Sequence, residues 1–285
     1  MKTPKDFHSH LQREHHPSKG RHHPSKGRNI SKIYTKGTIV PNLPKGHIWL
    51  YGLHTIEAAL KNPRRKIHRL LITSNAYSRL GFNESQFPCR YELTESRILD
   101  RYLGSEIVHQ GIMLETEPLI VGDLKNLPDL PLIVILDQIT DPHNVGAIMR
   151  SAVAFNASAV ITTTKHSPRE SSVLAKVAAG ALELINYIVV RNLARAIETL
   201  HEMGFQTFGL DSRGLQPLEA SFSGEKIALI LGAEGKGLRQ KTRKMVSTLA
   251  RLDMPGEIKS LNVSNAAAIA FYVAHSYLSH SKQRY

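Results

Sequence analysis

Residues 132–152 read LIVILDQITDPHNVGAIMRSA, and this stretch decides the fold. Its first five residues are all apolar, which is typical of a strand buried on both faces of a parallel sheet. The turn DPHN at 141–144 then leads into a helix expected at about 145–155. Asn144 can be an ordinary N-cap of that helix. Arg150 stands six residues later among the apolar neighbours of a packed helix, which indicates a local anionic partner.

The same alternation of short apolar runs and helical segments continues to the end of the chain. It predicts an α/β domain at 132–285 whose sheet is mostly parallel and covered by helices. In such folds ligands bind at the carboxyl ends of the strands. The expected strands are 132–137, 159–163, 187–190, 205–209, 227–231 and 248–252, and the expected helices are 145–155, 171–181, 193–203 and 263–280.

Upstream of this domain the chain divides into three parts. Residues 122–131 contain two prolines and a glycine and read as a linker, and 48–121 alternate strand and helix patterns as a small α/β domain. Residues 1–47 contain the repeat HHPSKGR twice, with ten Lys/Arg against two Asp/Glu, and are expected to be disordered. This tail is either a basic arm for RNA or a solvated extension.

Composition narrows the functional classes. The formal net charge of +13 and the isoelectric point near 9.8 indicate a polyanionic partner such as a nucleic acid. The single cysteine, Cys89, excludes an internal disulfide and a multi-cysteine metal site, and no metal site is predicted. No apolar run approaches the roughly 18 residues that a membrane span needs, and no signal-peptide pattern opens the chain. A cytoplasmic location is expected.

Two further segments carry polar residues beside apolar ones. LILGAEGKGL at 229–238 follows a buried strand but matches neither the Walker A nor the dinucleotide-binding glycine pattern. Glu234 within it is either a ligand-facing group or a solvated loop carboxylate. In MPGEIKSLNVSNAAAIA at 254–270, Ser260 and Asn262 precede a long alanine-rich helix, where they can be caps or functional groups.

Taken together, 136–152, 229–238 and 254–270 resemble the three motifs of the SpoU (TrmH-like) family of ribose 2′-O-methyltransferases, within the SPOUT class. LYGLHTIEAAL at 50–60 and VHQGI at 108–112 resemble the substrate-binding domain of family members that methylate a guanosine in 23S rRNA. The resemblance covers about 48–280 and leaves out the N-terminal tail.

The resemblance implies transfer of a methyl group from S-adenosylmethionine to the ribose 2′-OH of a nucleotide, expected to be a guanosine, in 23S rRNA or a ribosomal precursor. It implies a C-terminal trefoil knot, an L30e-like first domain that binds RNA, and a homodimer formed through the catalytic domain. The residues carried over as cofactor-binding are Gly232, Leu252, Met254 and Leu261, and those carried over as catalytic are Asn144, Arg150, Glu234, Ser260 and Asn262.

Alternatives remain at this stage. The substrate could be a tRNA ribose, or the chain could be a non-catalytic RNA-binding factor in ribosome assembly. In the family the position of Arg150 is assigned as the proton acceptor, but a guanidinium is poorly suited to that role because it stays protonated in proteins. We expect Arg150 to bind phosphate and to stabilise developing alkoxide charge. The basic run NPRRKIHR at 62–69 is a candidate contact for the RNA backbone.

Overall fold

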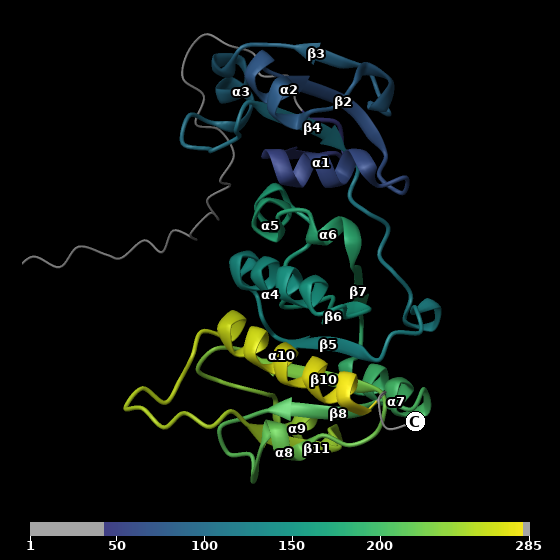
Figure 1. Cartoon of the computed structure of the whole chain (residues 1–285), viewed down its shortest axis with the longest axis vertical. Helices are drawn as coiled ribbons and strands as arrows, with labels where there is room; N and C mark the ends of the chain where they lie inside the picture. The colour runs from purple at the N-terminus through teal and green to yellow at the C-terminus, as the bar shows by residue number, and fades with distance from the viewer. Residues whose placement is uncertain (1–42, 282–285) are drawn as a thin grey trace, which may run out of the picture. The chain divides into compact units, whose positions relative to one another are not determined.

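The computed structural model describes residues 43–281, and two β-sheets carry the fold (Figure 1). The prediction of a disordered tail at 1–47 falls, for residues 1–42, outside the described residues. The next residues lead directly into the first strand through a turn in which the backbone N–H of His47 donates to the carbonyl of Pro44 over 3.0 Å. None of the helices within 43–281 combines the length and apolar character that crossing a membrane would require.

The larger sheet has seven strands, and every neighbouring pair in it runs parallel, which confirms the predicted parallel sheet. The carboxyl ends of its central strands therefore meet at one edge of the sheet. In spatial order the strands are β7 (Asn186–Val190), β6 (Ala159–Thr163), β5 (Leu132–Asp137), β10 (Ile227–Gly232), β8 (Gln206–Leu210), β11 (Thr248–Arg251) and β9 (Gln216–Pro217).

Strand β5 shows why this sheet needs helices on both sides. All of its residues are buried, and successive side chains enter two different apolar clusters. Val134 packs in the cluster that contains residues of α4 (Pro142–Ala154) and α10 (Val263–Ser281), whereas Ile135 packs in the cluster of α7 (Leu193–Glu202). The continuous apolar run in the sequence is thus the signature of a strand with two covered faces.

The helix expected at 171–181 is two short helices, α5 (Ser172–Ala178) and α6 (Ala181–Leu184). The expectation of one helix is wrong because Ala179 and Gly180 have φ values of 48° and 94°, and this left-handed backbone ends α5. A side chain at Gly180 would also press on α1 (Leu53–Lys61), since a Cβ there would lie 2.9 Å from that of Ala58. The remaining helices of the larger domain are α8 (Leu218–Ser221) and α9 (Gln240–Met245), with a 3₁₀ turn η2 (Leu124–Asn126) before β5.

The smaller sheet has four strands and mixes directions. In spatial order they are β1 (Ile48–Tyr51), β4 (Ile112–Thr116), β2 (Ile67–Ile72) and β3 (Tyr91–Leu93). The central strand β4 is antiparallel to both β1 and β2, and β2 is parallel to β3. Besides α1, the helical segments of this part are α2 (Ser74–Leu80), η1 (Glu84–Gln86) and α3 (Ser96–Leu103).

A buried ion cluster joins the two parts of the chain. The guanidinium of Arg65, just before β2, donates to the carboxylates of Glu170, 2.5 Å away, and of Glu183 in α6. The side chain of Arg65 is fully buried, and Asn62 completes the bonding of Glu183 with a 2.7 Å hydrogen bond. Arg65 therefore cannot contact an RNA backbone. It is removed from the basic residues at 62–69 that were predicted to bind RNA.

Candidate functional site

The clearest polar cluster lies at the carboxyl end of the central strands, around Glu234. Its Oε1 accepts from the side-chain amides of Asn144, over 3.2 Å, and Asn262, over 2.8 Å, and from the backbone N–H of Val263, over 3.2 Å. Asn262 also donates to Oδ1 of Asn144 over 3.0 Å. Among residues 43–281 all the recorded hydrogen bonds to the Glu234 carboxylate reach Oε1, and the residue is exposed.

Asn144 reaches this cluster because the helix starts earlier than expected. Helix α4 begins at Pro142, and the side chain of Asp141 is its N-cap, accepting from the backbone N–H of His143 over 2.9 Å. The interpretation of Asn144 as the N-cap is therefore wrong. Placed in the first turn, Asn144 is free to extend its amide to Glu234.

Asn262 combines the two roles that the sequence left open. Its Oδ1 accepts from the backbone N–H of Ser264 over 2.8 Å, which caps the start of α10. Its amide nitrogen simultaneously binds Glu234 and Asn144. The start of the last helix is thereby tied to the loop after β10.

The loop that carries Glu234 is a tight turn anchored at both ends. The backbone N–H of Gly237 donates to the carbonyl of Ala233 over 2.8 Å, and Gly235 and Gly237 have φ values of 74° and 65°. A side chain on Gly232 would overlap the backbone of Gly237, so the loop folds closely onto the end of its own strand. Glycine is required at these positions by conformation and by space.

Asp137 anchors the far side of the same loop and was missed as a functional support by the sequence reasoning. Asp137 ends β5 and is fully buried. Its carboxylate accepts from the backbone N–H of Arg239 over 3.1 Å, from the Arg239 Nε over 2.6 Å and from Thr242 Oγ1 over 2.7 Å. A carboxylate directly after five apolar strand residues was the signal that could have found it, because a buried charge needs several partners.

The predicted cofactor residues lie in two segments, the end of β10 and the connection between β11 and α10. Gly232 ends β10, Leu252 and Met254 follow β11, and β8 lies between these strands. The carbonyl of Met254 accepts from Lys259 Nζ over 2.8 Å. Leu261 is 40% exposed.

The loops after β8, β10 and β11 expose apolar and charged side chains. The exposed apolar side chains are Leu215, Ile258 and Leu261, and the loop after β10 packs its own backbone closely on Gly232. The side chain of Glu234 is exposed as well. Arg251, the last residue of β11, connects its strand to the loop after β8. It donates to the carbonyls of Gly214, over 3.1 Å, and Leu215, over 2.6 Å.

Arg150 and Ser260 do not join the Glu234 cluster through any hydrogen bond between described residues. Ser260 lies exposed in the loop before α10. Arg150 is exposed and lines a separate cavity of about 720 Å³ with residues of α1 and α6 such as His54, Lys61 and Glu183. The six residue steps from Asn144 to Arg150 correspond to a rise of about 9 Å and a net rotation of about 240°.

Comparison with known families matches both parts of the chain. Residues 131–272 match the model described as the SpoU rRNA Methylase family. Residues 49–120 match the model described as RNA 2′-O ribose methyltransferase substrate binding.

Curated relatives match over most of their length. The 23S rRNA (guanosine-2′-O-)-methyltransferase RlmB of Pseudomonas putida is 33% identical over 242 residues, which cover 79% of this chain and 94% of the relative. The protein of the same name from Ralstonia nicotianae is 35% identical over 239 residues, with the same two coverages.

Solved structures share the fold. The SpoU methyltransferase AviRb from Streptomyces viridochromogenes, in complex with the cofactor AdoMet, superposes with a TM-score of 0.68 at 22% identity and covers 81% of this chain and 90% of that one. An AdoMet-bound rRNA methyltransferase from Sinorhizobium meliloti gives a TM-score of 0.69 at 20% identity, covering 82% and 88%.

Proposed function

Because this chain belongs to the SpoU rRNA methylase family, we propose that it transfers a methyl group from S-adenosylmethionine to the ribose 2′-OH of a guanosine in 23S rRNA. The names of its relatives support the guanosine and the large-subunit RNA. The observation that carries the proposal is that the three predicted motifs meet at one carboxylate. Asn144 from the first motif and Asn262 from the third both donate hydrogen bonds to Glu234 from the second.

The residues have distinct parts in this reaction. When bound, S-adenosylmethionine supplies a methyl group already activated on a sulfonium. Gly232, Leu252, Met254 and Leu261 would hold it, in part through backbone groups. Glu234, fixed by Asn144 and Asn262, orients the reacting ribose or the loop around it, because alignment supplies much of the rate of such a transfer. Ser260 positions the substrate from the loop before α10.

Arg150 binds the target phosphate and stabilises negative charge developing on the 2′-oxygen. Its position on a different side of α4 from Asn144 supports a homodimer in which Arg150 of one subunit completes the Glu234 site of the other. One face of α10 supports the same dimer, because its large side chains Ile269 and Tyr272 are exposed to solvent in the single chain.

Two structural features and a location are proposed with this function. The small domain at 48–121 is an L30e-like module that binds RNA, joined by the linker 122–131 to the catalytic domain at 132–285, and its match to a substrate-binding family supports this. The C-terminal segment forms a trefoil knot, a proposal supported by the contact of Asn262 and Val263 with the loop after β10. A cytoplasmic location fits a ribosomal RNA substrate.

The test is a transcriptome-wide map of 2′-O-methyl groups on rRNA and tRNA from cells that lack this protein. The proposal expects one guanosine of the large-subunit rRNA to lose its methyl group. Re-expression of the wild type should restore the mark, and the Arg150→Ala variant should not. Loss of a tRNA mark would establish the tRNA alternative. An unchanged map together with a ribosome-assembly defect would establish the non-catalytic alternative.

A further inference from the structure

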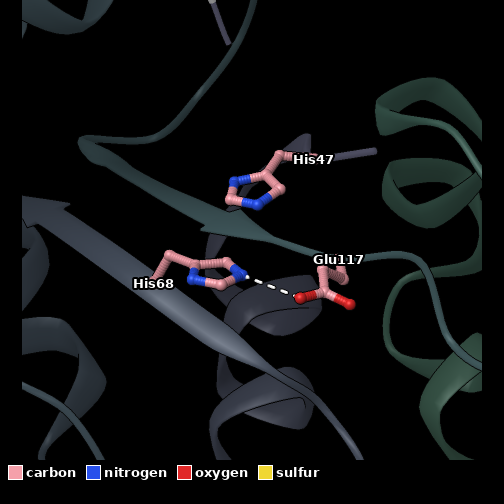
Figure 2. A group of neighbouring side chains, drawn as sticks. All are labelled: His47, His68 and Glu117. Atoms are coloured by element: carbon pink, nitrogen blue, oxygen red, sulfur yellow. Dashed lines mark ion pairs between the residues drawn. The ribbon is translucent and has the colours of Figure 1, made fainter. Parts of the chain in front are cut away.

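A second cluster of chemically versatile side chains lies far from the Glu234 loops, at one end of the smaller sheet. His47, His68 and Glu117 each offer a ligand atom, and these atoms all lie within 4.8 Å of one another. Figure 2 shows the two imidazoles side by side with the carboxylate of Glu117 next to them. The proposed methyl transfer uses none of these three residues.

Strand pairing explains why residues so distant in sequence meet here. His47 directly precedes β1, and Glu117 directly follows β4; the antiparallel pair Ile48–Thr116 places them opposite each other. Strand β2 starts at the same end of β4, because Ile67 also pairs with Thr116. Three chain segments therefore bring their polar residues to one end of the sheet.

A β-bulge places the third residue. In the β2–β4 ladder Ile67 pairs with Thr116, but Arg69 pairs with Glu115, so His68 is an extra residue without a partner. Bulges redirect side chains and are common beside functional sites. The bulged His68 directs its Nε2 to Glu117 Oε1, 3.3 Å away (Figure 2).

A carboxylate outside the cluster orients His47. Its Nδ1 lies 2.7 Å from Glu115 Oε1, and an ionised carboxylate can only accept, so Nδ1 carries the hydrogen. The lone pair of the neutral ring is then on Nε2, available to a metal. This carboxylate–histidine pairing is the arrangement that supports most metal-binding histidines.

We propose that His47, His68 and Glu117 bind one Zn²⁺ ion or a similar divalent transition metal, with Glu115 supporting His47 from outside. Two imidazoles and a carboxylate are a ligand set that suits zinc and leaves a fourth position for water. Tetrahedral binding would draw the ligand atoms to about 3.4 Å apart. The side chains are 18%, 36% and 36% exposed, so their ends have room to rotate from the present stack of the two rings.

The competing interpretation is an ordinary surface ion network. Lys66 Nζ lies 3.2 Å from Glu117 Oε2 and already offers that carboxylate a cation. Exposed pairs of this kind contribute little to stability, so a metal would displace Lys66 readily. A bound ion would hold the beginnings of β1 and β2 to the end of β4.

The experiment is a Zn²⁺ titration of the metal-free full-length chain against a chromophoric chelator, followed by Co²⁺ substitution. The tail carries adjacent histidines, which are potential metal ligands, so all variants are made in a full-length background with His15, His16, His22 and His23 replaced by glutamine. This background should retain one tight Zn²⁺ equivalent, show the visible absorption of tetrahedral Co²⁺, and melt at a higher temperature with Zn²⁺ than without it.

His68→Ala and Glu117→Gln should each lose the tight equivalent and the thermal shift while keeping the circular-dichroism spectrum of the parent. Lys66→Ala, which removes the competing cation, should bind Zn²⁺ at least as tightly. The matched control is His54→Ala, an exposed histidine outside the cluster, which should bind as the parent does. The proposal is overturned if the parent background binds no tight equivalent, or if folded Glu117→Gln retains it.

Discussion

Replacing Arg65 by methionine tests how the two parts of the chain are held together. The substitution keeps the aliphatic length of the side chain and removes the cation that faces Glu170 and Glu183. All three side chains are buried, with exposures of 0%, 7% and 2%. The variant therefore leaves two carboxylates that water cannot solvate and that repel each other.

Removing one partner from a buried ion pair costs about 3–5 kcal/mol of unfolding free energy. For a chain of this size that loss corresponds to a fall in melting temperature of about 6–20 °C. The matched control is Arg69→Met on the neighbouring strand. Arg69 also binds a carboxylate through two hydrogen bonds, to Glu92, but it is 35% exposed and its partner 56%. We expect the control to cost less than about 1 kcal/mol.

The pH dependence of the loss identifies its cause. Burial raises the pKa of Glu170 above its usual value, and removing Arg65 should raise it further. The folded variant then binds a proton more tightly than the unfolded chain, so its stability is retained at low pH and falls as the pH rises through the raised pKa. Adding Glu170→Gln and Glu183→Gln to Arg65→Met should recover most of the loss.

Chemical denaturation and thermal melting of the four proteins between acidic and slightly alkaline pH would measure these effects. The reasoning fails if Arg65→Met is no less stable than Arg69→Met. It also fails if the deficit of Arg65→Met is the same at every pH.

Three further predictions concern the Glu234 site. Arg150→Ala should abolish methyl transfer, whereas S-adenosylmethionine binding measured by calorimetry should persist. Mixing Arg150→Ala chains with Glu234→Ala chains should restore activity. A comparable loss of cofactor binding, or no restoration of activity, would refute the cross-subunit role of Arg150. Glu234→Ala should lower kcat/KM by about 10²-fold because the reacting groups are no longer aligned. Glu234→Gln should lower it by less, because the new amide oxygen still accepts from Asn144. Equal kcat/KM values for Glu234→Ala and the wild type would exclude orientation by Glu234. Gly232→Ala should weaken cofactor binding more than Gly235→Ala. A Cβ at Gly232 meets backbone atoms, whereas a Cβ at Gly235 has open space and adds only φ strain of about 1–2 kcal/mol. The reverse order would show that the loop tolerates a side chain at Gly232.

The parallel sheet could be predicted because burial on both faces leaves a direct trace in the sequence. The expected strands at 132–137 and 159–163 coincide with β5 and β6, since each is a continuous apolar run ended by polar residues. The short β9 and helix α9 left no such trace. Most of α9 is charged or polar, and only Thr242 within it is buried, where it binds Asp137.

Helix boundaries were harder because side-chain contacts decide them. Asp141 and Asn144 are both good caps, and only the 2.9 Å bond to His143 settles that Asp141 starts α4. Likewise the run at 171–181 favours one helix by propensity, but packing of Gly180 against α1 stops it. The burial of Arg65 could not be predicted either, since its partners lie more than a hundred residues away.

The spacing of Asn144 and Arg150 shows what the helical period adds to a family resemblance. The resemblance groups both residues in one catalytic set, yet six positions turn a helix through about 240°, so the two side chains leave α4 in different directions. Asn144 faces Glu234, and Arg150 faces the cavity beside α1 and α6. In the proposed dimer, a substrate that lies between two copies of the site would let one helix serve a single reaction from two sides. The interval of six is therefore itself an argument for a methyl-transfer centre shared by two subunits, and the mixed-variant experiment decides it.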